Sequence, residues 1–187
     1  VTSVVALGGD TLASGCRDGS VRVWRDSGRG FECQATFAAH RGAVLRLRQV
    51  GDELVSSGAD GAVVCHSLDG QLLRTERTHR GWVWALAVDG AGTIASGSED
   101  GAMRCGEARA CGPSAVRSVA FAGQRVIWGF ADGSLAVCGR DMSTQQRLVG
   151  HRGAVCDIAM VGDRHLASAA EDDDVRLWDL DSGQSVA

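Results

Sequence analysis

Short runs of alternating apolar and polar residues follow one another along the whole chain, and each run ends in a turn that contains glycine. Residues 12–14 and 21–23, for example, flank the pair Asp18-Gly19. Alternation with a period of two predicts half-buried strands, and Asp-Gly tolerates the positive φ angles of a tight hairpin turn. No segment keeps a period of 3.6 residues, so we expect an all-β fold without a long helix.

The pattern repeats at a nearly constant spacing. The turns begin at Asp18, Asp60, Asp100, Asp132 and, in a degenerate copy, Asp172, with steps of 42, 40, 32 and 40 residues. The sequence therefore predicts one repeat region over residues 1–187, truncated at both ends. Its units lie at about residues 1–30, 31–69, 70–107, 108–141 and 142–187.

The units resemble the WD40 repeat of β-propellers, in which Gly-His, Ser-Gly-x-x-Asp-Gly and a strand ending in Trp-Asp recur every 40–45 residues or so. The last unit matches best, from Gly150-His151 through Ser168 and Asp172 to Trp178-Asp179. The resemblance implies four-stranded antiparallel blades and an incomplete propeller of about five units, for which seven blades would be common. A closed five-bladed ring is the alternative.

The resemblance also implies a structural tetrad in each unit: a His, a strand Ser, the turn Asp and a terminal Trp, joined by hydrogen bonds. Only unit 5 has a complete set. The Trp position is taken by His66, Gly106 and Cys138 in units 2, 3 and 4, so we expect these middle units to be less stable than unit 5. Unit 4 also has Gly112 and Trp128 in place of His and Ser. The matching residues are Ser14, Asp18 and Trp24 in unit 1; His40, Ser56 and Asp60 in unit 2; His79, Ser96 and Asp100 in unit 3; and His151, Ser168, Asp172 and Trp178 in unit 5.

Two further expectations concern packing. The apolar residues after each turn should be buried, namely Val21, Val23, Val63, Cys65, Val175 and Leu177. Of Trp82 and Trp84, one should lie in the core and the other should be less buried.

The 32-residue step between the third and fourth turns is about eight residues shorter than the other steps. The missing residues fall between Gly106 and Gly112, where the outer strand of unit 3 should run. We therefore expect this edge strand to be lost or stretched.

Charge and cysteine content narrow the function classes. The net charge is −4, which argues against nucleic-acid binding, and all 19 basic residues are Arg. Seven Cys without C-x-x-C spacing favour reduced thiols in an intracellular protein, cytoplasmic or nuclear, with neither metal nor cofactor. No apolar run approaches the 18 or so residues of a membrane helix.

We therefore expect a non-enzymatic scaffold that binds other proteins or peptides, acidic or phosphorylated, on its top face and blade edges, and that self-associates through open propeller edges. The top-face residues implied by the resemblance are Arg41, Arg80, Trp82, Arg152, Arg17, Glu99 and Glu171. One alternative is the substrate-recognition propeller of a ubiquitin ligase of the F-box/WD kind. A remote alternative is an enzyme at the channel mouth, where Arg46, Ser118 and Asp157 are the available polar residues.

Overall fold

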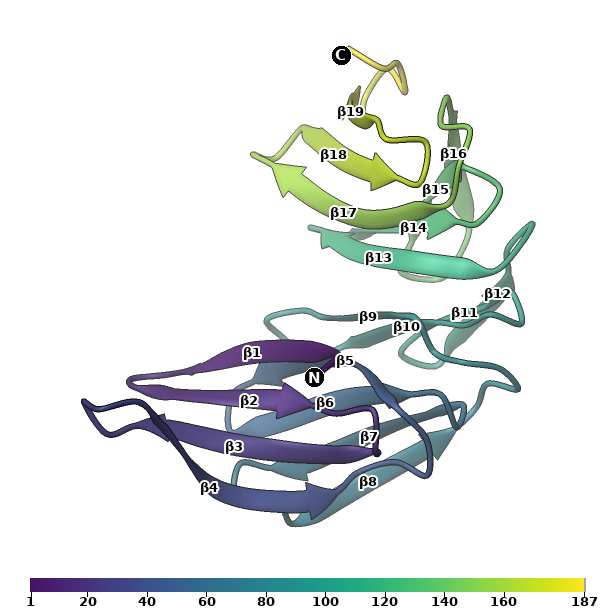
Figure 1. Cartoon of the computed structure of the whole chain (residues 1–187). Coiled ribbons are helices and arrows are strands. Elements are labelled where there is room, and N and C mark those ends of the chain that lie inside the picture. The colour runs from purple at the N-terminus through teal and green to yellow at the C-terminus, as the bar shows by residue number, and fades with distance from the viewer. Residues whose placement is uncertain (187) are drawn as a thin grey trace.

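The computed structural model describes residues 1–186, and its regular structure is entirely β (Figure 1). The strands form five antiparallel sheets, blades 1 to 5, each ordered as in the sequence. Blade 1 contains β1 (Ser3–Gly8), β2 (Thr11–Gly15), β3 (Ser20–Asp26) and β4 (Phe31–Ala38). Blade 2 contains β5 (Val44–Val50), β6 (Glu53–Gly58), β7 (Ala62–Ser67) and β8 (Leu72–Arg77). Blade 3 contains β9 (Ala85–Val88), β10 (Ile94–Gly97), β11 (Ala102–Cys105) and β12 (Ala108–Cys111). Blade 4 contains β13 (Val116–Ala122), β14 (Arg125–Phe130), β15 (Ser134–Gly139) and β16 (Thr144–Val149), and blade 5 contains β17 (Val155–Val161), β18 (His165–Ala170) and β19 (Val175–Asp179).

The predicted all-β fold of antiparallel blades is confirmed. Blade 3 keeps its outer strand in spite of the short step, because the four residues of β12 suffice to pair with the equally short β11. Within the described residues blade 5 has three strands, and an isolated bridge between Trp178 and Ser185 stands in place of a fourth strand beside β19. Within residues 1–186 there is no helix, and hence none that could cross a lipid bilayer.

The hairpin turns have the backbone that their sequence predicts. Gly19, Gly61, Gly101 and Gly133 have φ angles between 76° and 85°. In the degenerate fifth turn Asp173 takes this place with φ 65°, a conformation that Asp adopts more readily than most residues.

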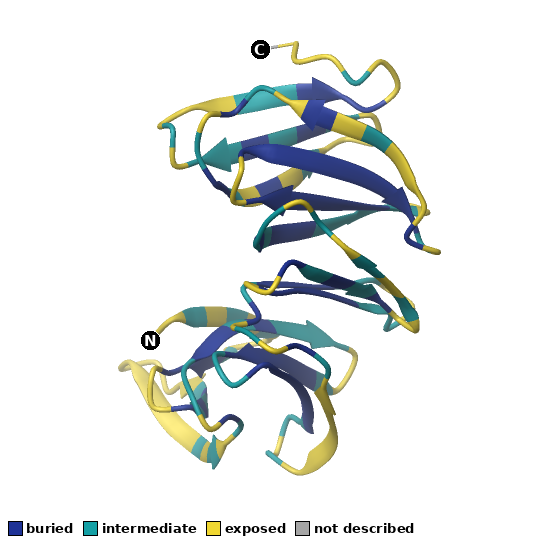
Figure 2. Ribbon diagram, turned by 90° about the vertical axis from the view of Figure 1, so that its right-hand side faces the viewer, coloured by how far each residue is buried: buried dark blue, intermediate teal, exposed yellow. Residues whose placement is uncertain are grey.

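Consecutive blades pack through their first strands, in the order β1, β5, β9, β13 and β17 (Figure 1). The same contact recurs at each junction: apolar residues of the third strand of one blade meet the first strand of the next. Val21 and Val23 share a core cluster with Val44 and Leu47, and the later junctions repeat this arrangement. Figure 2 shows that burial is concentrated in the second and third strands of the middle blades, such as β6, β7, β14 and β15, whereas β4 and β8 are largely exposed.

The blades form an open array, in which β17 does not pack against β1 within residues 1–186 (Figure 1). This corrects the burial expectation for the last unit. Val21, Val23, Val63 and Cys65 are buried, but Val175 is 71% exposed and Leu177 is only half-buried. The expectation was wrong for β19 because its partner would be the first strand of a following blade, and the described chain contains none.

Candidate functional site

Blade 5 contains a complete hydrogen-bond network of the tetrad type. His151 Nδ1 lies 3.1 Å from the Asp172 carboxylate, and its Nε2 lies 2.8 Å from Ser168 Oγ. The Trp178 indole donates to the same Oγ at 2.8 Å. Because a carboxylate only accepts, Nδ1 is the protonated nitrogen, and the Ser168 hydroxyl then donates to Nε2 while it accepts from Trp178. All three buried side chains are thereby satisfied.

The turn aspartate of blade 5 is held as a carboxylate. The backbone N–H of Arg152 donates to Asp172 at 2.7 Å, and His151 donates from the other side. These bonds, the one from Arg152 first, lower the pKa of Asp172 to about 2, although burial opposes them. The network therefore also fixes the backbone of the loop that carries Arg152.

Blade 2 has the same arrangement without the tryptophan. His40 lies 2.8 Å from both Asp60 and Ser56, and the N–H of Arg41 donates to Asp60 at 3.0 Å. His66 occupies the tryptophan position, where it is buried and lies 4.8 Å from the ring of Phe37. Burial lowers the pKa of His66, so the neutral imidazole acts as an aromatic filler.

Blades 1 and 3 have partial networks. In blade 1 the Trp24 indole donates to Ser14 at 2.8 Å, while Asp18 is exposed and bonded to Ser20 and Arg22. In blade 3 His79 Nε2 lies 2.8 Å from Ser96, but its Nδ1 is 4.0 Å from Asp100 and has no hydrogen-bond partner. Burial lowers the pKa of His79 to about 4.

Blade 4 replaces the network by aromatic packing. Trp128 and Phe130 are buried in one apolar cluster together with Cys138, which stands at the tryptophan position. A Cβ at Gly112 would lie 2.2 Å from the Phe130 ring, so Phe130 fills the space next to the missing histidine. The Trp128 indole nitrogen is left without an acceptor.

Three exposed guanidinium groups stand at equivalent positions in the loops that enter β5, β9 and β17. The backbone of each is tied to a turn aspartate: Arg41 to Asp60, Arg80 to Asp100 at 2.7 Å, and Arg152 to Asp172. Within residues 1–186 none of their side chains has an ion pair or hydrogen bond. The exposed residues Arg17, Glu99 and Glu171 precede the turn aspartates. We call these six residues and Trp82 the top rim.

Trp82 is 46% exposed, and it belongs to a chain of contacts that the sequence analysis did not identify. Its ring centroid lies 5.2 Å from that of Trp84, and the Arg117 guanidinium lies 4.6 Å from the centre of the Trp84 ring. Arg117 also pairs with Glu171 at 3.6 Å. The expectation that one of the two tryptophans is a core residue was wrong. Residues two apart in an extended chain share a face, and Val83 between them is the buried one.

Trp84 and Arg117 could have been found from the repeat alignment. Each directly follows the valine at or just before the start of the first strand of its blade, and the equivalent residues in blades 2 and 5 are Leu45 and Cys156. A large aromatic residue and a cation at one repeat position in neighbouring blades is a signal for contact across the blade junction.

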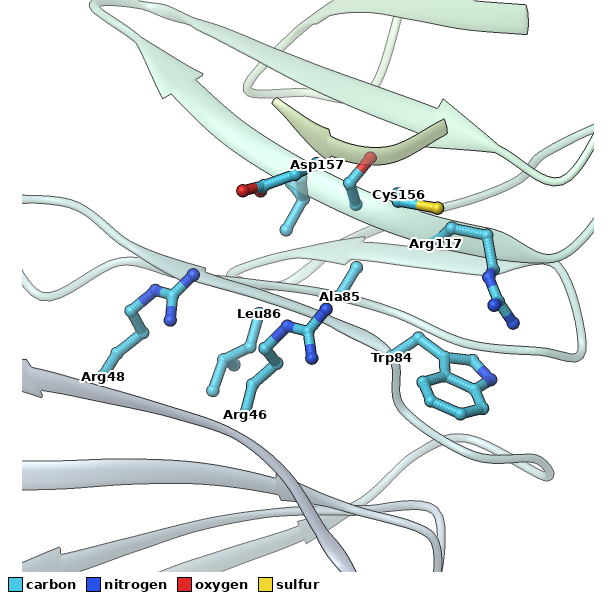
Figure 3. A pocket seen from close by; sticks show the side chains of 10 residues that line it. Arg46, Arg48, Trp84, Ala85, Leu86, Arg117, Cys156 and Asp157 are labelled. Atoms are coloured by element: carbon cyan, nitrogen blue, oxygen red, sulfur yellow. The ribbon is translucent and has the colours of Figure 1, made fainter. Parts of the chain in front are cut away.

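The inner strands line a polar pocket (Figure 3) that contains Arg46, Ser118 and Asp157, the residues considered for an enzyme. The structure brings them together but does not arrange them as a nucleophile and base. Ser118 donates its hydroxyl to the carbonyl of Val155 at 2.8 Å, and Asp157 accepts the N–H of Ile158 at 3.0 Å. No cluster of three or more His, Cys, Asp or Glu within residues 1–186 could hold a metal.

Comparison with known proteins gives one family and several relatives, two of which are described here. The family model "WD domain, G-beta repeat" (WD40) matches residues 1–25, 70–105 and 142–179, more than half of the chain. The nuclear distribution protein PAC1 of Kluyveromyces lactis is 33% identical over 91 residues, which are 41% of this chain and 21% of that protein. The type II inositol polyphosphate 5-phosphatase 15 of Arabidopsis thaliana is 35% identical over 112 residues, 50% of this chain and 10% of that protein. The chain thus matches 21% of the length of the first relative and 10% of the length of the second.

Proposed function

Since the chain belongs to the WD40 repeat family, whose domains in general bind other proteins, we propose that it is a non-enzymatic scaffold whose top rim docks an acidic or phosphorylated segment of a partner protein. The observation that carries the proposal is the set of three exposed, unpaired guanidinium groups of Arg41, Arg80 and Arg152. The backbone N–H of each of these arginines is bonded to a turn aspartate, which reduces the backbone freedom that the loop loses on binding.

The chemistry of the rim favours an anionic partner. The planar fork of Arg matches the oxygens of carboxylates and phosphates, and bidentate pairs of this kind are among the stronger hydrogen bonds. Trp82 adds an exposed aromatic surface, and Trp and Arg are the residue types that dominate binding energy at interfaces. Glu99 and Glu171 lie next to Gly81 and Gly153, the residues that follow Arg80 and Arg152, and would repel an acidic segment from this part of the rim.

A role as the substrate receptor of a ubiquitin ligase would need a further domain outside this sequence. An enzymatic role is not favoured, because the polar groups of the inner pocket donate to or accept from backbone atoms. An intracellular location, cytoplasmic or nuclear, is part of the proposal and is supported by the seven cysteines, all of them free thiols.

The proposal is tested with a triple variant of the rim. Arg41→Ala, Arg80→Ala and Arg152→Ala together should abolish capture of partners from a set of acidic and phosphorylated peptides on beads. The matched control is Arg25→Ala, Arg29→Ala and Arg109→Ala, which removes the same charge from exposed positions outside the rim. Peptide capture that survives the rim variant, or that both triple variants lose equally, would refute the rim as the docking site.

A further inference from the structure

The inner pocket gathers cations from two blades. Arg46 and Arg48 extend from β5, and Arg117 extends from β13, with Trp84 between them (Figure 3). Arg46 and Arg48 are two apart on one strand and therefore project from the same face, towards the centre of the array. In a chain with a net charge of −4, this is a local concentration of positive charge.

Two of the three cations, Arg46 and Arg48, have no ion pair within residues 1–186, whereas Arg117 pairs with Glu171 at 3.6 Å. Arg46 donates only to the carbonyl of Leu45 at 3.1 Å, and Arg48 only to that of Leu47 at 2.8 Å. No carboxylate of residues 1–186 lies within 4.0 Å of either guanidinium, and Asp157 is the only acidic residue that lines the pocket. Burial, followed by the charge of Arg46, lowers the pKa of Arg48, as expected for cations crowded in a partly dry site.

Hydrogen-bond donors are likewise in excess. Each guanidinium has five N–H groups and no acceptor, and carbonyls of the same strand satisfy only one contact of Arg46 and one of Arg48. The buried indole nitrogen of Trp84 has no acceptor within residues 1–186, but in Figure 3 it points away from Arg46 and Arg48, so the spare donors that face a ligand are those of the guanidinium groups. Such a pocket is complementary to a group that carries negative charge and only accepts hydrogen bonds.

We propose that this pocket is a binding site for a single phosphate group, held by Arg46 and Arg48 with Arg117 at its edge. A phosphate supplies two negative charges and several acceptor oxygens, and it fits the Arg fork. The site lies on the inner strands and shares none of the three rim arginines, so it does not depend on the docking of a partner at the rim. The phosphate can be inorganic or carried by a phosphoserine side chain, and the experiment separates the two.

The test is a titration followed by ¹H–¹⁵N NMR of the arginine Nε–H and tryptophan indole signals at constant ionic strength. The probes are inorganic phosphate, a short phosphoserine peptide and the same peptide without phosphate. We expect inorganic phosphate to shift the signals of Arg46, Arg48 and Trp84, with binding weakened at least about tenfold in Arg46→Gln/Arg48→Gln. Arg29→Gln, at an exposed position far from the pocket, should bind as the wild type does. Tighter binding of the phosphoserine peptide than of free phosphate would identify a phosphorylated protein as the source.

A second variant keeps the test decisive if the double variant folds poorly. Asp157→Asn removes the one carboxylate of the pocket while its side-chain oxygen can still accept from Ile158, so phosphate should bind several-fold more tightly. The rim triple variant should leave phosphate binding unchanged, which distinguishes a failure of the rim from a failure of this site. Absence of any shift at Arg46 and Arg48, equal loss in Arg29→Gln, or unchanged affinity in Asp157→Asn would overturn the proposal.

Discussion

At the scale of single residues, Ser168 is the centre of the only complete network in the molecule as described. Its hydroxyl serves His151 and Trp178 at once, and both partners are buried. In blade 1 the equivalent Ser14 serves only Trp24. The two serines therefore form a natural comparison, since the same substitution leaves two buried polar atoms unpaired in one blade and one in the other.

Ser168→Ala should lower the free energy of unfolding by about 2–3 kcal/mol, because an unsatisfied buried partner costs roughly 1–3 kcal/mol. Ser14→Ala should cost about half as much, because it leaves only Trp24 Nε1 without its acceptor. Urea denaturation followed by tryptophan fluorescence measures both values. Equal losses in the two variants would contradict the assigned network.

His79 should make stability depend on pH. Its pKa is lowered from 6.5 to about 4 by burial, so between these values the unfolded chain takes up a proton that the folded chain does not. The contribution of the neutral His79 ring to the free energy of unfolding is therefore fully present above about pH 6.5 and is lost as the pH falls towards 4. His79→Gln should flatten this part of the urea-midpoint profile and leave its slope above pH 7 unchanged. An unaltered slope between pH 6.5 and 4 would show that His79 is not buried as a neutral ring.

At the scale of the strands, the sequence predicts hairpins well and contacts between blades poorly. Alternation and Asp-Gly turns are local signals, and they identified the strands on both sides of Gly19 and Gly133. The His, Ser and Asp positions followed from the family resemblance. Trp84 and Arg117 did not, because their contact joins two blades and depends on packing that no single repeat contains. Val175 was assigned to the core for the same reason.

A glycine at the end of β10 allows blade 4 to approach blade 3. A Cβ at Gly97 would lie 2.3 Å from a methyl group of Val116, which is fully buried at the junction. Gly97→Ala should therefore destabilise the protein by about 1–3 kcal/mol through overpacking. Gly90→Ala is the matched control, because nothing lies within 4 Å of its Cβ position. Thermal unfolding compares the two, and a Gly97 variant as stable as the Gly90 variant would argue against close packing of these blades.

At the scale of the whole molecule, the two ends of the array expose the two strands that pair up at every junction between blades: the first strand of blade 1 at one end and the third strand of blade 5 at the other. Val175 in β19 corresponds to Val21, and Val4 in β1 corresponds to Leu47, and this pair of positions is buried at the junction of blades 1 and 2. At the ends Val175 is 71% and Val4 57% exposed. Complementary ends on one chain favour a head-to-tail contact between copies.

The chain as given should therefore self-associate as its concentration rises. Val4→Asp and Val175→Asp should each shift the sedimentation equilibrium towards the monomer, because a charge replaces an apolar contact. Val149→Asp, at an equally exposed position on the outer strand β16, should have no such effect. A monomer at all concentrations, or equal effects of the three changes, would contradict head-to-tail pairing.

The central claim, that a partner docks on the top rim, is tested most directly by hydroxyl-radical footprinting of the chain with and without a captured acidic or phosphorylated peptide. Trp82 on the rim and Leu72 and Leu73 on the outer strand β8 are all exposed and oxidisable, so one experiment reports on both surfaces. The account predicts that the peptide protects Trp82 and leaves the two leucines as reactive as before. Protection of Leu72 and Leu73 with unchanged oxidation of Trp82 would place the partner on the blade edge and contradict the claim.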